Sequence, residues 1–579
     1  MTFNGAHSDE GIFARAQKSD PRLRGLVGPG GPFEIEDVVI DGIPLRSFVR
    51  APATIVDVFQ AAKTHAGLDH LVFEGVRLTF ADVRQQALSI AGRLKSAFGI
   101  AQGDRVAIAM RNFPEFVTSF WAAAALGAIV VPLNAWWTGP ELRHAIEDAG
   151  AKVVFADMER VQRLTSLDED RTAVPVVGVR TAGTGFTGDA EFGELANGAP
   201  LDEADLAALG PDDVVAILYT SGTTGRPKGA LLTNRNIIVS SMNMTLDLAR
   251  DVLLADRDPG LAGQPATMAV APLFHIGGIG SMVGGAMSGL KIALMPKWNL
   301  EEALALAERE QVTSLGGVPA IARQFLGHPG VTRLTGQVRS FSMGGASVPP
   351  DLPRQALDVL GDSLRIFNGY GLTETTSAVV TNVGAEYAAH PDSVGRPNLT
   401  ADLRIEDPDG KPFPSGAIGE LCFRSPQVAK GYWNNPEATR RAFVDGWFHT
   451  GDLGYVDDDG FVYVVDRLKD VIIRGGENVY CAEVEAVLFE HPAVAEVAVV
   501  GLAEQVMGER VCAVVILRPG FDLQLAELRA FAEKQLAAFK CPEALYLTTD
   551  VPRTATGKTE KRQLKVQVSN DSAQIQLLW

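Results

Sequence analysis

From about residue 70 onward, short apolar runs alternate with stretches whose apolar positions recur at helical spacing. The pattern predicts strands at residues 105–110, 128–133, 152–156 and 214–219, and a helix over residues 115–125. Strands that alternate with helices are typical of parallel sheets covered by helices. We therefore predict an α/β fold for this large part of the chain.

A second pattern begins after the charged turn Asp466–Asp470, which follows a short strand at residues 460–465. It predicts helices at residues 482–489 and 525–537 and strands at residues 494–500 and 510–517. Such a mixture over roughly 110 residues describes a separate α+β domain of ordinary size. The predicted organisation is an N-terminal arm over residues 1–50, extended on the surface, a large domain over residues 51–466 and a small domain over residues 467–579.

Two segments without a Lys, Arg, Asp or Glu side chain, Phe116–Pro140 and Pro259–Leu290, are long enough to raise the question of a membrane. Pro, Gly or Asn interrupts each of them where a spanning helix should continue. We therefore predict buried helices and strands there and no integral membrane segment. A third segment, residues 174–212, is rich in Gly, Thr, Asp and Ala, which indicates an excursion on the surface.

Composition adds that the chain is globular and acidic. It has 579 residues, of which 46% are hydrophobic and 21% charged, enough for more than one domain. Lys and Arg number 52 against 70 Asp and Glu, so the net charge is −18. This balance disfavours nucleic acid as a partner. A smaller polyanion would have to be held locally, by backbone N–H groups and a few placed cations.

The four cysteines, Cys422, Cys481, Cys512 and Cys541, do not form a C-x-x-C pair, so we expect no zinc site. Their scatter is typical of core thiols in a reducing compartment. The first 20 residues contain no apolar run of the secretory type. The sequence therefore predicts a cytoplasmic protein.

The most informative segment is Leu218–Gly229, where a strand runs into a loop rich in glycine and hydroxyl side chains. Its glycines bring backbone N–H groups close to an anion, and Lys228 adds a mobile positive charge. The hydroxyl donors are Thr220, Ser221, Thr223 and Thr224, and the loop glycines are Gly222 and Gly225. Because Lys228 precedes Gly229 and Ala230 follows, the segment is not a Walker A loop, which disfavours a P-loop NTPase or kinase.

At these residues the chain resembles the adenylate-forming family, which includes acyl-CoA synthetases, aryl-CoA ligases, luciferases and the adenylation domains of peptide synthetases. The resemblance covers about residue 50 to Lys561 and rests on several separate motifs. It implies a large N-terminal domain of helix-covered sheets with a distorted β-barrel part and a small, mobile α+β C-terminal domain. It also implies ATP, Mg²⁺ and coenzyme A as cofactors and a small carboxylic acid as substrate. The sequence leaves the oligomeric state open, with a homodimer as one candidate.

Two motifs of the large domain resemble the adenine and metal positions of the family. In Asn368–Glu374, Tyr370 can offer a flat face to a purine and Glu374 can hold Mg²⁺. The resemblance assigns these roles to Tyr370 and Glu374, and gives Thr220 a share of the metal. The other predicted ATP-binding positions here are Asn368, Gly369, Gly371 and Thr373, with Gly344, Gly345 and Ala346 of Ser342–Ser347 as a second wall.

Three motifs toward the C-terminus resemble the rest of the family's site. Asp452, which ends Trp447–Asp452, resembles the acceptor for the ribose hydroxyls, and Arg467 resembles a second ribose contact. Lys469 matches the hinge of the small domain, and Gly475 with Gly476 matches the loop that lines the entry for CoA. Lys558 in Pro552–Lys558 matches the lysine that contacts the carboxylate and the α-phosphate in the first half-reaction only.

The segment Pro272–Met287 carries no formal charge and resembles the acyl pocket. Peptide-synthetase domains place an Asp there to pair an ammonium group, whereas this chain has His275 after Phe274, which disfavours an amino-acid substrate. His275 is predicted to act as a gate or to contact the carboxylate. The glycines at 277, 278, 280, 284 and 285 either leave volume for an apolar acyl chain or ring, or serve close helix packing.

Together these motifs predict a ligase that forms an acyl-adenylate and then transfers the acyl group to CoA. The predicted catalytic residues are Lys558, Lys228, Thr223, Glu374 and His275. Three alternatives stay open: a ligase that loads a carrier-protein arm, a luciferase-like oxygenase, and a nucleotide-binding regulator without turnover. The sequence does not choose between fatty and arylalkanoic acids.

Overall fold

The structure, a computed structural model, describes residues 22–165, 174–186, 188–220, 227–254, 263–554 and 558–578. Contacts divide the chain into two compact units. The first contains residues up to Asp402 together with Phe423–Phe448, and the second contains Leu403–Cys422 and His449 onward. The boundary predicted at residue 466 stays a prediction, and each unit is described below by itself.

One sheet of the first unit has seven strands in its described part, in the order β11-β10-β6-β5-β7-β8-β9. These strands are β5 (Arg105–Ala109), β6 (Ile129–Pro132), β7 (Ala151–Asp157), β8 (Val176–Val179), β9 (Ala190–Glu191), β10 (Val214–Thr220) and β11 (Lys228–Thr233). Strands β5, β6, β7 and β8 pair in parallel, as the alternating pattern predicts. Helix α5 (Pro114–Ala125) has a proline at its start and is buried almost throughout, which confirms the prediction for its charge-free segment.

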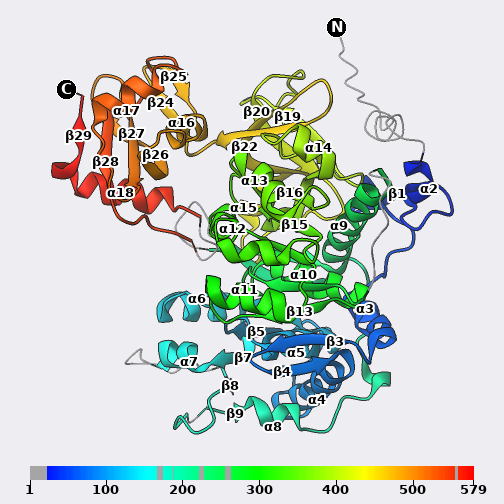
Figure 1. The fold of residues 1–579 in the computed structure, drawn as a ribbon. Helices are drawn as coiled ribbons and strands as arrows, with labels where there is room; N and C mark the ends of the chain where they lie inside the picture. The colour runs from blue at the N-terminus through cyan, green and yellow to red at the C-terminus, as the bar shows by residue number, and fades with distance from the viewer. Residues whose placement is uncertain are drawn as a thin grey trace. The chain divides into compact units, whose positions relative to one another are not determined.

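A second sheet of this unit has nine strands among the described residues, in the order β18-β17-β16-β15-β14-β12-β13-β3-β4. Its strands are β3 (Asp69–Phe73), β4 (Val76–Thr79), β12 (Ala266–Ala269), β13 (Lys291–Leu294), β14 (Ser314–Gly317), β15 (Ser340–Gly344), β16 (Arg365–Leu372), β17 (Ser377–Val383) and β18 (Arg396–Pro397). Figure 1 shows α4 (Phe80–Phe98) and α5 beside β3 and β4. Thr79 begins α4 with a capping box in which its hydroxyl accepts from the Asp82 N–H.

The remaining helices of the first unit lie between and beside these strands. They are α2 (Leu23–Val27), α3 (Ile55–Ala61), α6 (Gly139–Ala149), α7 (Met158–Thr165), α8 (Phe192–Ala196), α9 (Asn234–Leu254), α10 (Ile276–Ser288), α11 (Leu300–Arg309), α12 (Pro319–Leu326), α13 (Asp351–Leu360), α14 (Gly384–Ala389) and α15 (Pro436–Ala442). Among the helices that the structure describes, none is both long enough and apolar enough to cross a membrane.

The C-terminal part forms a six-stranded sheet in which β24 (Ile472–Arg474), β25 (Glu477–Val479), β26 (Val494–Glu504), β27 (Gly508–Leu517), β28 (Ala544–Leu547) and β29 (Gln576–Leu577) take part. Its helices are α16 (Cys481–Phe489), α17 (Leu525–Ala532) and α18 (Lys561–Asn570). Figure 1 shows these helices around the strands, in orange and red. The predicted α+β pattern is confirmed, although α17 ends five residues before the predicted Ala537.

A five-stranded sheet precedes this part along the chain, in the order β19-β20-β22-β21 with β23 beside β22. Its strands are β19 (Asp402–Glu406), β20 (Gly419–Arg424), β21 (Phe443–Val444), β22 (Trp447–Val456) and β23 (Val462–Arg467). Strand β23 begins two residues later than the predicted strand at 460–465.

Two surface predictions are wrong in part. Residues 174–212 include β8, whose four residues are all buried in the seven-stranded sheet, because the short run Val176–Val179 pairs with β7. The described part of the predicted arm contains α2 and the hairpin of β1 (Ile35–Ile40) with β2 (Ile43–Phe48), in which Leu23, Val27 and Phe48 are buried. The first 21 residues lie outside the described part.

A buried ion pair follows β7. Arg160 Nη1 donates to both carboxylate oxygens of Asp157, at 2.9 and 3.1 Å, and Nε donates to the Ala135 carbonyl at 2.8 Å. Both side chains are nearly inaccessible, at 1% and 6% exposed. Burial raises the pKa of Asp157, and the charge of Arg160 opposes that rise. The Arg160 guanidinium therefore offsets part of the cost of burying the Asp157 carboxylate, together with the backbone N–H groups of Arg111 and Arg160.

Substituting Arg160→Met should lower the free energy of unfolding by about 3–5 kcal/mol, because Asp157 would remain buried without its partner. Urea unfolding at neutral pH measures this loss. The matched control is Lys152→Met, since Lys152 pairs with Asp104 at 2.8 Å but is 49% exposed. That exposed pair should cost about 1 kcal/mol or less. Equal losses in the two variants would contradict the assignment of Arg160 as an anchor.

Candidate functional site

The predicted phosphate loop connects two paired strands. Strand β10 ends at Thr220 and β11 begins at Lys228, and these two residues face each other in the antiparallel register. The Thr220 hydroxyl donates to the Lys228 carbonyl at 3.4 Å. The predicted positions Ser221, Gly222, Thr223, Thr224 and Gly225 lie outside the described residues. The described frame thus places both ends of the loop side by side at the end of β10.

Tyr432 joins the loop to the predicted metal ligand. Its hydroxyl donates to Glu374 Oε1 at 2.8 Å, and the Lys228 ammonium lies 5.2 Å from the centroid of its ring. Tyr432 also forms an isolated β-bridge with Ala230 of β11. Burial and the neighbouring Glu374 raise the pKa of Tyr432, so its hydroxyl keeps the proton that it donates. Lys228 and Glu374, far apart in the sequence, therefore contact one side chain.

Glu374 lies on a short 3₁₀ turn, Thr373–Thr375, directly after β16. The two residues that follow the turn, Thr376 and Ser377, have positive φ angles of 48° and 79°. Such a conformation is costly for residues other than glycine and needs support from the surroundings. Ser240 supplies part of it, because its hydroxyl donates to the Thr376 carbonyl at 2.5 Å. The backbone at Glu374 is held in a fixed, strained turn.

The other predicted adenine positions lie at the ends of two neighbouring parallel strands. Strands β15 and β16 pair with Gly344 opposite Gly369, so the two predicted walls are adjacent. Strand β16 also carries Asn368, Tyr370 and Gly371, and Thr373 begins the turn after it. Gly345 and Ala346 come directly after β15. A Cβ atom at Gly371 would lie 1.9 Å from the Ser377 carbonyl oxygen, so only glycine fits there.

Helix α10 carries the predicted acyl pocket, and His275 precedes its first residue as the N-cap. The glycines of this helix differ in their surroundings. A Cβ atom at Gly278 would lie 2.5 Å from Leu273, so this glycine serves close packing. Cβ atoms at Gly277, Gly280 and Gly284 would meet no described atom within 4 Å. Gly277 is exposed and Gly280 and Gly284 are partly exposed, so these three positions, at helical spacing, form a solvent-accessible stripe of α10.

Aromatic side chains lie at the start of this helix. The ring of Phe274 packs edge-on against Trp136 with 5.3 Å between centroids, and the His275 ring lies 6.3 Å from Phe274. Met282 is fully buried on α10, as expected for a wall residue. Phe274 and Met282 are buried, whereas Trp136 is 42% exposed, so aromatic surface at the start of α10 is open to solvent.

In the second unit, the two predicted ribose contacts touch each other. Asp452 on β22 pairs in register with Arg467 on β23, and Arg467 Nε lies 3.0 Å from Asp452 Oδ1. The Asp452 side chain is almost completely buried, whereas Arg467 is half exposed. The carboxylate is thereby oriented by a cation that solvent can reach, an arrangement suited to accepting hydrogen bonds from a diol.

The charges of Asp452 and Arg467 affect the pKa values of two nearby lysines, Lys469 and Lys558. Burial lowers the pKa of Lys558 most, Arg467 lowers it further, and Asp452 opposes both. Burial is also the largest cause that lowers the pKa of Lys469. Lys558 follows a loop whose residues 555–557 lie outside the described part, and its backbone N–H donates to the Thr554 hydroxyl at 3.2 Å. The unit thus gathers four of its predicted site residues.

Gly475 and Gly476 form the two-residue turn between β24 and β25, with φ angles of 61° and 87°. Positive φ at both central residues is the geometry of a tight hairpin and favours glycine. The Gly475 N–H donates to the Met507 carbonyl at 2.8 Å. The turn therefore requires glycine for its own conformation, and the role in CoA binding stays a prediction.

Sequence reasoning missed Tyr432 because the long-range pairing that puts it beside Lys228 and Glu374 leaves no local pattern. The only available signal was the aromatic pair Tyr432-Trp433 shortly before the predicted ribose motif. The structure brings Lys228, Glu374 and Thr220 to one region of the first unit, and Asp452, Arg467, Lys469 and Lys558 to one region of the second.

Comparison with known proteins gives the enzyme family to which the chain belongs. A family model of AMP-binding enzymes matches residues 58–433, and a model of the AMP-binding enzyme C-terminal domain matches residues 483–558. The chain belongs to the AMP-binding enzyme family. Its resemblance to adenylate-forming enzymes, predicted from the motifs, is confirmed, as is the α/β fold with a large N-terminal and a small C-terminal domain.

Individual relatives narrow the class to acid–CoA ligases. Feruloyl-CoA synthase of Amycolatopsis sp. is 36% identical over 494 residues, which cover 85% of this chain and 94% of the relative. The long-chain-fatty-acid–CoA ligase FadD13 of Mycobacterium tuberculosis is 34% identical over 498 residues, with 85% and 94% covered.

Solved structures of a CoA synthetase resemble this chain over most of its length. O-succinylbenzoate CoA synthetase of Bacillus subtilis in complex with its acyl-adenylate intermediate superposes with a TM-score of 0.77 at 29% identity, and covers 89% of this chain and 99% of its own. The same enzyme has been solved with ATP and a magnesium ion, with a TM-score of 0.76.

Proposed function

We propose that this protein is an ATP-dependent, AMP-forming ligase that joins an apolar carboxylic acid to coenzyme A. The observation that carries the proposal is that Tyr432 contacts both Lys228 and Glu374, which gathers a cation and a carboxylate at the base of the glycine-rich loop. Family membership and CoA-ligase relatives over most of the chain support the same reaction. The cytoplasmic location and the homodimer remain predictions.

In the first half-reaction, a carboxylate oxygen of the acid attacks the α-phosphorus of ATP. A bond forms between that oxygen and phosphorus, and the bond to pyrophosphate breaks. Lys228 and Lys558 are the proposed sources of positive charge that offset the negative charge developing on the phosphate oxygens. The carboxylate is already ionised near neutral pH, so it needs no base.

Two oxygen donors of this chain fit Mg²⁺. Glu374 offers a carboxylate whose Oε1 is fixed by the Tyr432 hydroxyl, and Thr220 offers a hydroxyl at the start of the loop. Hard oxygen ligands of this kind suit the ion. When bound, Mg²⁺ supplies positive charge to the phosphate oxygens. Glu374 and Thr220 are its proposed holders.

In the second half-reaction, the CoA sulfur attacks the acyl carbon of the adenylate. A carbon–sulfur bond forms, the carbon–oxygen bond to AMP breaks, and the thiol proton passes to solvent. Rotation of the small domain about Lys469 is proposed to withdraw Lys558 and to bring Gly475 and Gly476 to the thiol. Asp452 and Arg467 are the proposed ribose contacts in both steps.

The proposed substrate class is an aryl or alkyl carboxylic acid without a second charge. The α10 helix carries no charged side chain, three of its accessible glycines leave room for an acyl group beside the helix, and Phe274 and Trp136 add aromatic surface at its start. A charged substituent in such surroundings would lose hydration without gaining a partner. The name of feruloyl-CoA synthase, which is 36% identical, indicates an aryl acid as its substrate. The name of the long-chain-fatty-acid–CoA ligase FadD13, which is 34% identical, indicates fatty acids.

A panel of carboxylic acids tests the function directly. Purified protein with ATP, Mg²⁺ and CoA should release AMP and form acyl-CoA with hydroxycinnamic or medium- to long-chain fatty acids, and should not respond to amino acids. AMP release without acyl-CoA would point to a carrier-protein acceptor. Absence of acid-dependent pyrophosphate release across the panel would overturn the proposal.

The pH dependence of the first half-reaction should reflect the protonation state of Lys558. Its working form is the protonated amine, and its pKa lies below the ordinary lysine value, chiefly because it is buried. Pyrophosphate release should therefore decline as pH rises through that lowered pKa, below about pH 10.4. Lys558→Arg keeps its charge, so its residual activity should lack this alkaline decline. The same decline in both proteins would contradict the assignment.

A further inference from the structure

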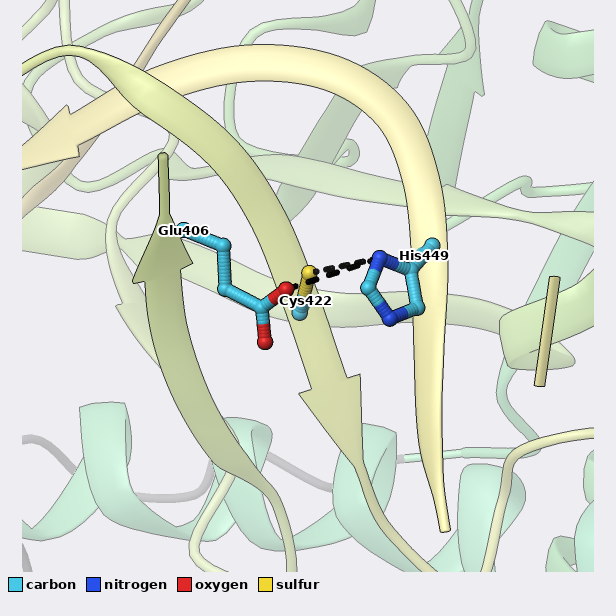
Figure 2. Close-up of side chains that lie close together, drawn as sticks. All are labelled: Glu406, Cys422 and His449. Atoms are coloured by element: carbon cyan, nitrogen blue, oxygen red, sulfur yellow. Dashed lines mark hydrogen bonds and ion pairs between the residues drawn. The ribbon is translucent and has the colours of Figure 1, made fainter. Parts of the chain in front are cut away.

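Three different metal-binding side chains, none of them assigned to the nucleotide site, form a cluster in the five-stranded sheet. Glu406 is on β19, Cys422 on β20 and His449 on β22, and these strands are neighbours in the five-stranded sheet. Figure 2 shows the carboxylate, the thiol and the imidazole directed toward one another from their three strands. One ligand atom from each lies within 4.8 Å of the other two.

Two of the distances in this cluster are close to those between ligands of one metal ion. Cys422 Sγ lies 3.5 Å from His449 Nδ1, which lies 3.7 Å from Glu406 Oε2. Zinc binds sulfur, nitrogen and oxygen at about 2.0–2.3 Å in a tetrahedron, which puts neighbouring ligand atoms about 3.3–3.6 Å apart. Small side-chain adjustments would bring the three atoms onto one ion.

Burial and charge fit a divalent cation. Cys422 is fully buried, the Glu406 side chain is 2% exposed, and the His449 side chain is 20% exposed. A thiolate and a carboxylate together neutralise two positive charges, so the occupied site would carry no net charge from these groups. Arg404 forms an ion pair with the other oxygen of Glu406, which orients the carboxylate.

The structure also places His449 Nδ1 3.2 Å from Glu420 Oε2, a contact that orients the imidazole without a metal. Burial raises the pKa of the Cys422 thiol, so without a cation this thiol stays protonated. A soft thiol, an imidazole and a carboxylate converging from three strands form the donor set of zinc sites. Such a set differs from Glu374 and Thr220, which offer oxygen alone.

We propose that Glu406, Cys422 and His449 form a binding site for a zinc-type divalent cation, with water as the fourth ligand. Binding forms a metal–sulfur bond, and the thiol proton passes to solvent. The cation ties β19, β20 and β22 together. Because His449 lies three residues before Asp452 on β22, the ion anchors the strand that carries the proposed ribose acceptor.

Cobalt(II) absorption tests this site without acid, ATP or CoA. Untagged full-length protein, freed of metal by chelation, should bind one equivalent of Co²⁺ with visible tetrahedral bands and a thiolate-to-cobalt band in the near ultraviolet. Zn²⁺ should abolish both, and excess Mg²⁺ should not. Binding should be tighter at pH 8 than at pH 6.5, since the thiol must lose its proton.

Cys422→Ser should lose the near-ultraviolet band, and Cys512→Ser, which changes an equally buried thiol of the same unit, should keep it. His449→Asn, at a more exposed position, should weaken binding by at least about tenfold, and it serves if the Cys422 variant does not fold. The proposal is overturned if the wild type shows no thiolate band, or if the Cys512 variant loses it as fully as the Cys422 variant. Neither result depends on the ligase reaction.

Discussion

Replacing Lys558 with alanine should slow acid-dependent pyrophosphate release by about a hundred- to a thousandfold, the usual cost of removing one group that stabilises a developing charge. Transfer of the acyl group from a preformed acyl-adenylate to CoA should stay within about threefold of the wild type, since Lys558 is proposed to leave before that step. Separate assays of the two half-reactions, by pyrophosphate and by acyl-CoA, measure the split.

The matched control for this variant is Lys565→Ala. Lys565 lies on α18, seven residues further along, and pairs with Glu509 at 2.8 Å on the surface. Its loss should leave both half-reactions unchanged. If Lys558→Ala lost both half-reactions equally, the scheme of two conformations would be wrong.

Replacing Lys469 with proline should slow the second half-reaction by about tenfold or more relative to the first, a difference of about 1.4 kcal/mol in activation free energy. Proline fixes φ at its own position and disfavours the helical region at Leu468, so the turn loses the freedom that a rotation needs. Among the described residues, the Lys469 N–H donates no backbone hydrogen bond that proline would remove. The ratio of the two half-reaction rates is the measurement.

Lys469→Ala separates the loss of rotation from the loss of the amine. It keeps a rotatable backbone, so it should change the ratio far less than proline does. A proline variant whose two half-reactions fall in parallel, or do not fall, would remove Lys469 as the pivot.

Much of the fold could be predicted because its signals are local. Apolar runs such as Val214–Tyr219 and the helical pattern before Gly127 define elements without reference to distant residues. The prediction for residues 174–212 was wrong in part because it relied on the Gly, Thr, Asp and Ala content of the segment and gave too little weight to its four-residue apolar run. Val176–Val179 forms a buried strand because it pairs with β7, and this pairing depends on how the sheet is assembled and not on the local sequence.

The candidate site was predictable wherever a motif is contiguous, as at Asp452 and Arg467, which the structure pairs. It was not predictable where function depends on register between distant strands. Tyr432 is one case. The cysteine spacing predicts no zinc site, and the site proposed above would use ligands far apart in the sequence, which a spacing rule does not count. Glu406, Cys422 and His449 converge because three strands pair, which no spacing rule contains.

The shared ring of Tyr432 has a consequence for how this enzyme tolerates change. Lys228 and Glu374 both contact it, so the cost of altering either depends on what stands at the other position. A substitution at Lys228 should therefore change how strongly the protein responds to a substitution at Glu374, and a variant of Tyr432 should weaken this coupling.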